Sequence, residues 1–313
     1  MKGLCWILPL ALALVAAPTA PAVEGALPRT ISGASVMPYQ GLIPPDPGWL
    51  VGVGETFYSG DIGGHPIPLH GNIVADVDSK LSFTPLTLMY IWDTHSECWN
   101  FASGITLPLA YVDVEASVTA GNLLGQRSDD KFGLFDIAVT PIIASYHFSK
   151  TDHMSFGLTV WAPTGEYEEG QLANLSTNNW TFIPAIAYTK ILPGPNIELT
   201  GQWSLQFYTE NDATDYQNGI VSDLEFTAIK RFHNGFGIGL VGSWMDQLTD
   251  DDGPTADALN GFSGRAFGVG PILTYSTKLG EADFSVNARW VHEFDNERLL
   301  EGDVGMLNLS LKF

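Results

Sequence analysis

Apolar and polar residues alternate along most of the chain in segments of about ten residues. Between residues 196 and 208, for example, Ile197 and Leu199 fall on one face of an extended chain, and Glu198 and Gln202 fall on the other. A period of two residues predicts β-strands that are apolar on one face and polar on the other. No stretch after residue 22 has the roughly 18 consecutive apolar residues of a transmembrane helix. The pattern therefore predicts an all-β protein.

About twelve such segments can be delimited. They are Gly48–Tyr58, Leu81–Trp92, Trp99–Val114, Phe132–Phe148, Met154–Ala162, Trp180–Lys190, Asn196–Tyr208, Gly219–Phe232, Phe236–Met245, Gly264–Thr277, Ala282–Phe294 and Val304–Phe313.

The connections between these segments alternate in length. Short turns such as Asp93–Cys98 and Ser149–His153 are followed by long linkers, several of them rich in acidic residues, such as Pro163–Asn179 and Asp246–Ser263. An even number of strands with this rhythm is typical of outer-membrane barrels, in which short turns face the periplasm and long loops face outward. We therefore predict an antiparallel, up-and-down transmembrane β-barrel over residues 48–313. A soluble lectin-like domain or sandwich is the alternative.

Both ends of the chain favour export to the outer membrane. Residues 1–22 combine Lys2, an apolar run and an Ala20-Pro21-Ala22 cleavage site, which is the pattern of a secretory signal peptide. The final strand alternates and ends on Phe313, which resembles the C-terminal signal that bacterial outer-membrane barrels present to the barrel-assembly machinery. We expect the mature chain to lie in the outer membrane of a Gram-negative cell.

Between the signal and the first strand, residues 23–47 show no strand pattern and end in Pro44-Pro45-Asp46-Pro47. This segment is expected either to lie in the periplasm or to fold into the barrel as a plug. Removal of the signal leaves Cys98 as the only cysteine, so no internal disulfide is expected.

The formal charge of -21 argues against nucleic acid as a partner. Most of the acidic residues fall in the long linkers, where we expect them to face solvent and lipopolysaccharide. Outer-membrane lipids, lipopolysaccharide and a small-molecule solute are the expected partners.

Polar residues on the faces that would line the lumen are the main functional candidates, because a solute passing through a pore sheds water and needs replacement partners. The alternative is that the basic residues among them only neutralise buried acids in a narrow barrel. The candidates are Asp136, Glu198, Gln202, Gln206, Asp223, Glu225, Arg231, Asn287, Arg289, Glu293, Asn308 and Lys312.

No cofactor, metal site or catalytic site is expected. Asp61, His65 and His70 share a linker, but the intervening prolines prevent a helical pair of ligands. A lipid hydrolase would need a serine and a histidine within reach of each other, and Ser145 and His147 share a face, but near the periplasmic end.

Eight segments, in order along the chain, resemble the MetA pathway of phenol degradation family of Gram-negative outer-membrane barrels. They are Pro44–Trp49, Asp136–Pro141, Pro163–Tyr167, Trp180–Ala187, Asp215–Gly219, Gln247–Gly253, Phe267–Pro271 and Glu301–Asp303.

This resemblance implies passive uptake of small aromatic or hydrophobic solutes by an outer-membrane channel. Tyr167 and Tyr216, at the expected outer rim, are candidates for admitting an aromatic solute, with stiff loop turns as the competing account. A closed structural or ligand-binding barrel that acts through its extracellular loops is the alternative function.

Overall fold

The computed structural model describes residues 27–62, 66–120, 123–259 and 263–313. The expected signal peptide at residues 1–22 and the first four residues of the segment after it lie outside this part of the chain. The described residues contain no helix that is long and apolar enough to span a membrane.

Twelve antiparallel strands form a closed barrel, in which each strand pairs with its neighbours along the ring and β14 pairs with β1. The backbones of Trp49 and Phe313 exchange two hydrogen bonds of 2.9 Å at this closing seam. The barrel strands are β1 (Gly48–Ile62), β3 (Asn72–Ile91), β4 (Trp99–Ala120), β6 (Ile137–His147), β7 (Asp152–Ala162), β8 (Thr181–Leu192), β9 (Ile197–Tyr208), β10 (Val221–Arg231), β11 (Phe236–Gln247), β12 (Arg265–Leu279), β13 (Ala282–Glu297) and β14 (Glu301–Lys312).

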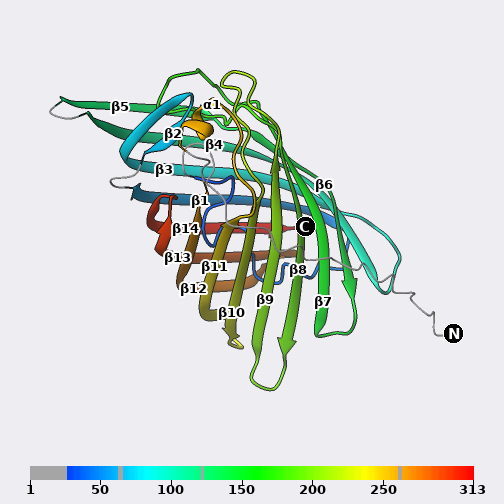
Figure 1. Ribbon diagram of the computed structural model, residues 1–313. Coiled ribbons are helices and arrows are strands. Elements are labelled where there is room, and N and C mark those ends of the chain that lie inside the picture. Colours follow the sequence, from blue (N-terminus) through cyan, green and yellow to red (C-terminus); the bar gives the residue numbers. More distant parts are fainter. Residues whose placement is uncertain (1–26, 63–65, 121–122, 260–262) are drawn as a thin grey trace.

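This architecture confirms the predicted all-β, twelve-stranded antiparallel barrel. Within the described residues, the long connections contain two additional strands, β2 (Ile67–Leu69) and β5 (Leu123–Leu134), and one short helix, α1 (Pro254–Ala258). Figure 1 shows β3, β4 and β5 continuing well past the other strands at one end of the barrel. Much of the expected loop sequence there is therefore extended strand.

The single strand predicted over Phe132–Phe148 is wrong, because the structure divides it into β5 and β6. The division falls at Phe135 and Asp136. Oδ1 of Asp136 accepts hydrogen bonds of 3.0 Å from the backbone amides of Thr164 and Gly165. A side chain thus replaces the strand ladder at this point of the wall, and β4 passes from pairing with β6 to pairing with β5.

The outer surface of the barrel carries an apolar band bounded by aromatic side chains. Leu107, Leu240 and Leu273 are exposed within the band. Near the end with short turns, the rings of Trp49 and Tyr90 pack against each other with centroids 4.8 Å apart. Exposed apolar side chains flanked by aromatic residues are what a lipid-facing surface requires.

Strand β2 and the connection 163–180 form a cap over the end of the barrel that has the long connections. The ring of His70, which follows β2, lies edge-on to the ring of Tyr167 with centroids 5.5 Å apart. The backbone oxygen of His70 accepts a hydrogen bond of 2.9 Å from Gly170. Burial lowers the pKa of His70 to about 4 from its ordinary value of 6.5. The packed cap therefore keeps this imidazole neutral.

Gly270 lies where β12 passes very close to β13. A Cβ atom at Gly270 would lie 1.7 Å from the backbone oxygen of Trp290, whereas a Cβ at Gly305 in β14 would meet nothing within 4 Å. We predict that Gly270→Ala lowers the stability of the barrel by about 1–3 kcal/mol through overpacking, and that Gly305→Ala leaves it unchanged. The stability of each variant is measured as the urea concentration at which its heat-modifiable gel band shifts to the position of the unfolded chain. Equal midpoints for Gly270→Ala and the wild type would contradict the close approach.

The depressed pKa of His70 predicts that the cap is stable at neutral pH and loosens in acid. The folded cap binds no proton at this ring until the pH approaches about 4, whereas the unfolded ring takes one up below its ordinary value of 6.5. The free energy of cap folding should therefore decrease as the pH falls between these values. Hydrogen exchange of the backbone amides around β2 measures this free energy, once the rates are corrected for the intrinsic pH dependence of exchange. His70→Asn should abolish the dependence, and His95→Asn, at an exposed ring, should leave it intact.

Candidate functional site

The N-terminal segment of residues 27–47 runs through the inside of the barrel. The backbone amides of Gly33 and Val36 each donate a hydrogen bond of 2.7 Å to the carboxylate of Glu225, in the middle of β10. The amide of Gly41 donates to Oγ1 of Thr189 on β8, at 3.0 Å. The segment therefore occupies the lumen, as the blue trace inside the ring of strands in Figure 1 also indicates. We call residues 29–41 the lumen segment.

Contacts with β9 show that the lumen segment follows the barrel lengthwise. Near the end with long connections, the amide of Arg29 donates to the hydroxyl of Tyr208, at 3.3 Å. Further along the segment, the amide of Tyr39 donates to the carboxylate of Glu198, at 2.6 Å. Tyr208 and Glu198 lie near opposite ends of β9. The lumen segment therefore extends along a large part of the length of the lumen.

Buried carboxylates on β9 and β10 hold the segment. Asp223, Glu225 and Glu198 are each at most 1% exposed. Oδ2 of Asp223 accepts a hydrogen bond of 2.8 Å from the hydroxyl of Ser35. Buried carboxylates are costly unless they are hydrogen-bonded or paired with a cation. Here the segment supplies those hydrogen bonds, mostly from its backbone.

Two arginines, Arg289 buried and Arg231 partly buried, complete the attachment. The guanidinium of Arg289 donates to the backbone oxygens of Gly33 and Val36 at 2.7 Å and 2.6 Å. The turn from Gly33 to Val36 is therefore bound through its carbonyls as well as its amides. Arg231 forms an ion pair with Glu198 and places its guanidinium 4.6 Å from the ring centroid of Tyr39. Arg231 therefore neutralises an acid and also packs against the segment.

The other residues predicted to line the lumen divide into two groups. Gln202 bonds to Gln40, and Gln206 donates to the hydroxyl of Thr30, so both contact the lumen segment. Apart from Asp136, four remain. Glu293 accepts from Tyr58 and Gly302, Asn287 accepts from Arg289 and Asn308, and Lys312 is half-buried at the last position of β14.

Asp136 binds Arg29, a residue that the sequence patterns did not single out. Nη1 of Arg29 lies 2.8 Å from Oδ2 of Asp136, and both side chains are at most 1% exposed. The same guanidinium lies over the rings of Phe135 and Trp161, at 5.6 Å and 5.3 Å from their centroids. Arg29 is the only arginine or lysine between Lys2 and Lys80, which is the one signal in the sequence that could have identified it.

The part of the interior nearer the long connections is apolar. Side chains of the strands pack there against residues of the connections and of the N-terminal segment. This cluster includes Ile31, Val36, Tyr58, Ile62, Ile67, Leu69, Val77, Val114, Leu172, Val241, Met245, Val291, Leu299, Leu300 and Met306. The interior thus has a polar part, bound to the lumen segment, and an apolar part beneath the cap.

The two tyrosines predicted at the rim serve as contacts between connections. Tyr216 is fully buried and its hydroxyl bonds to the carboxylate of Asp251. The hydroxyl of Tyr167 accepts a hydrogen bond of 2.9 Å from Asn211. Both environments are those of side chains that hold loops together.

Ser145 and His147 do not bond to each other. The hydroxyl of Ser145 donates to the backbone oxygen of Gly41 at 2.8 Å, and His147 bonds to His153 and Asn100. Within the described residues, no group of three or more histidine, cysteine, aspartate or glutamate side chains could hold a metal ion.

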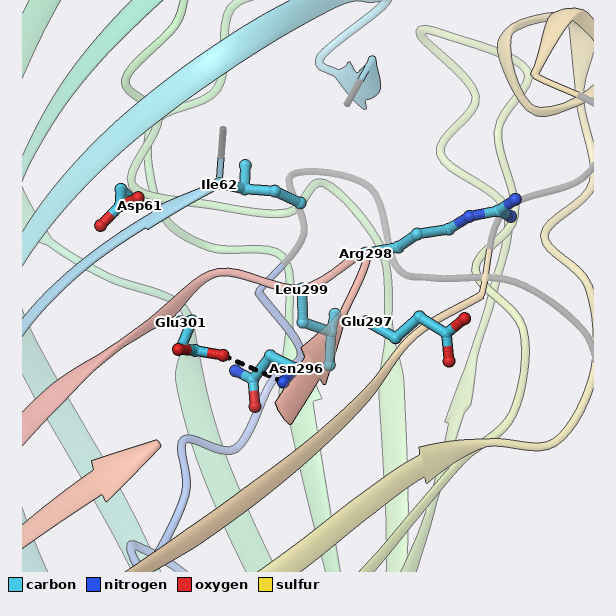
Figure 2. A pocket seen from close by; sticks show the side chains of 7 residues that line it. All are labelled: Asp61, Ile62, Asn296, Glu297, Arg298, Leu299 and Glu301. Carbon is cyan, nitrogen blue, oxygen red and sulfur yellow. Dashed lines mark hydrogen bonds between the residues drawn. The ribbon is translucent and has the colours of Figure 1, made fainter. Parts of the chain in front are cut away.

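A hollow of about 500 Å³ lies at the rim between β1 and the connection from β13 to β14. Figure 2 shows its lining residues, among them Asp61, Glu301 and Asn296, whose backbone amide donates to Glu301 at 3.0 Å. It is lined mainly by exposed polar side chains and lies apart from the lumen segment.

The fold resembles that of a solved outer-membrane channel. A COG4313 outer membrane channel from Pseudomonas putida F1 superimposes with a TM-score of 0.70 at 15% sequence identity, over 89% of this chain and 100% of that chain. A FadL homologue from Pseudomonas aeruginosa gives a TM-score of 0.43 at 9% identity, over 95% of this chain and 98% of that chain. No curated protein matches the chain.

The closed barrel, its lipid-facing band and the family match that follows place the protein in the Gram-negative outer membrane. Residues 63–309 match the family described as "Putative MetA-pathway of phenol degradation". The match confirms the resemblance seen in the sequence, and the chain belongs to this family.

Proposed function

We propose that the protein is a non-enzymatic channel for passive uptake of small aromatic or hydrophobic solutes, and that the lumen segment closes it in this state. One observation carries the proposal. Asp223, Glu225 and Arg289 bind chiefly the lumen segment, and Glu198 binds both the segment and Arg231. If the segment moves out, these groups would border a polar passage in which water and solute replace its backbone.

The apolar part of the interior supports a hydrophobic solute. A solute that enters beneath the cap would meet valine, leucine and isoleucine side chains before it reaches the polar part. Burial of apolar surface favours such entry at roughly 25 cal/mol per Å². The lipid-facing band further supports outer-membrane lipids and lipopolysaccharide as surroundings, and the exposed ring of Phe313 remains the proposed contact for the assembly machinery.

A closed barrel that acts through its outer loops is the second candidate. Packing among the outer connections favours it, because the carboxylate of Asp251 accepts hydrogen bonds from both Tyr216 and Gln247. Measurements of conductance separate the two candidates.

A disulfide that ties the lumen segment to the wall should stop transport. A Cβ atom built at Gly33 would lie 3.7 Å from Cβ of Val291 on β13, which is close to the usual Cβ separation of a disulfide, about 3.8 Å. In a Cys98→Ser background, Gly33→Cys with Val291→Cys should form this bond on oxidation. We predict no solute entry in liposome-swelling assays for the oxidised protein and recovery on reduction to the level of the Cys98→Ser parent.

Each single cysteine variant, oxidised in the same way, is the control. Equal swelling rates for the oxidised and reduced double variant would show that the segment is not the barrier. A parent protein that passes no solute in either form would favour the closed barrel.

Arg289→Gln should shift the channel towards the open state. It removes two charge-assisted hydrogen bonds to the carbonyls of the lumen segment, and one such bond is worth about 1.5–3 kcal/mol. We predict an open fraction in planar bilayers that rises by about 10–100-fold. Lys312→Gln, at the end of β14 away from the segment, should leave the open fraction unchanged. An Arg289→Gln channel as silent as the wild type would contradict the role of this attachment.

A further inference from the structure

Two aromatic rings and a carboxylate lie against the guanidinium of Arg29, and a third ring packs against those two rings. Phe83, Phe135 and Trp161 lie with ring centroids between 5.5 and 6.4 Å from one another, and each ring is half-buried. We call these three rings with Asp136 the aromatic box. Phe83 comes from β3, Trp161 from β7 and Phe135 from the break between β5 and β6, so the box spans three parts of the wall.

The box holds a planar group that donates hydrogen bonds. The guanidinium is flat, lies over two of the rings, and donates to Oδ2 of Asp136 at 2.8 Å and to Oγ1 of Thr181 at 3.2 Å. An aromatic ring is also flat and stacks on other rings with a gain of about 0.5–1.5 kcal/mol beyond burial. A ring that carries a hydroxyl also offers a donor to Asp136.

Asp136 does not depend on Arg29 alone. Its carboxylate also accepts hydrogen bonds from the backbone amides of Thr164 and Gly165, at 3.0 Å each, and of Thr177, at 3.3 Å. Backbone donors of this kind stabilise the charged form of a carboxylate. The carboxylate would therefore keep partners if Arg29 left, and it would accept a hydroxyl in the same place.

One polar atom beside Arg29 is a hydrogen-bond donor, and a guanidinium cannot accept its hydrogen bond. Asn179 accepts from Thr177 and Thr181 through its side-chain oxygen, and both of those hydroxyls bind Arg29. Its amide nitrogen is buried and has no partner among the described residues. A guanidinium has no acceptor to offer, whereas a hydroxyl both donates and accepts.

We propose that the aromatic box is a solute subsite for planar aromatic compounds that carry a hydroxyl, and that Arg29 occupies it in the closed state. The solute competes with Arg29, and its binding releases the start of the lumen segment. This deepens the proposed function, because it names the solute class and the residues that select it. Arg29 is thus both the first anchor of the segment and a stand-in for the solute.

The first test compares 4-fluorophenol with 4-fluorotoluene, which differ only in a hydroxyl and a methyl group, by ¹⁹F NMR in detergent. Arg29→Ala should bind 4-fluorophenol at least about tenfold more tightly than the wild type, because the wild-type box is free in only a fraction of molecules. 4-Fluorotoluene should bind weakly to both. Arg29→Ala with Trp161→Leu should lose the binding, whereas Arg29→Ala with Trp180→Leu, at an exposed tryptophan outside the box, should keep it.

Equal binding of the two ligands, or binding that survives the loss of Trp161, would overturn the proposal. Unchanged heat-modifiability on a gel shows for each variant that the barrel is folded.

The second test asks whether the solute displaces Arg29 in a chain that retains it. Thr30→Cys in a Cys98→Ser background reports release of the segment through its rate of reaction with a small, water-soluble thiol reagent. 4-Fluorophenol should raise this rate and 4-fluorotoluene should not. An unchanged rate at saturating 4-fluorophenol would overturn the proposal, because the box would then be only a cavity that a mutation opens.

Neither readout requires conduction. A barrel that binds 4-fluorophenol but never conducts would refute the channel and leave the subsite. A barrel that conducts without binding would refute the subsite and leave the channel.

Discussion

The structure depends on one constraint: carboxylates and arginines placed inside a closed barrel must find partners there. Glu225 and Arg289 could in principle have found all their partners among other residues of the wall. Instead, Glu225 accepts two amides of the lumen segment and Arg289 donates to two of its carbonyls. The turn from Gly33 to Val36 is therefore held by both its donors and its acceptors. The wall and the segment satisfy each other, which explains how a narrow barrel tolerates so many buried polar groups.

This arrangement links closure to the chemistry of passage. The groups that bind a peptide backbone in the closed state are donors and acceptors that a solute and water could use once the segment has moved. The apolar cluster beneath the cap and the aromatic box around Arg29 would provide the apolar contacts along such a path. In this account the strength of the segment's attachment sets how often the path is free, because each lost contact shifts the ratio of open to closed molecules.

Much of the fold could be predicted from the sequence. The two-residue period indicates which face of each strand is apolar, and the alternating lengths of the connections indicate the topology. The break at Asp136 could not be predicted, because it depends on amides of Thr164 and Gly165 that lie far along the chain. The course of residues 27–47 was equally hidden, since the segment has no period and its partners Asp223 and Glu225 lie almost 200 residues away. Periodicity indicated that Glu198 and Arg231 face inward, but it cannot say what fills the space in front of them.

The lumen segment is bound to the wall through its backbone, and the proposed closure rests on this attachment. Hydrogen exchange at the amides of Gly33 and Val36, resolved residue by residue in the detergent-refolded barrel, tests it most directly. We expect these two amides to exchange as slowly as the amides of β9 and β10, because a buried carboxylate accepts both hydrogens. Exchange as fast as in an unstructured peptide, with β9 and β10 still protected, would contradict it.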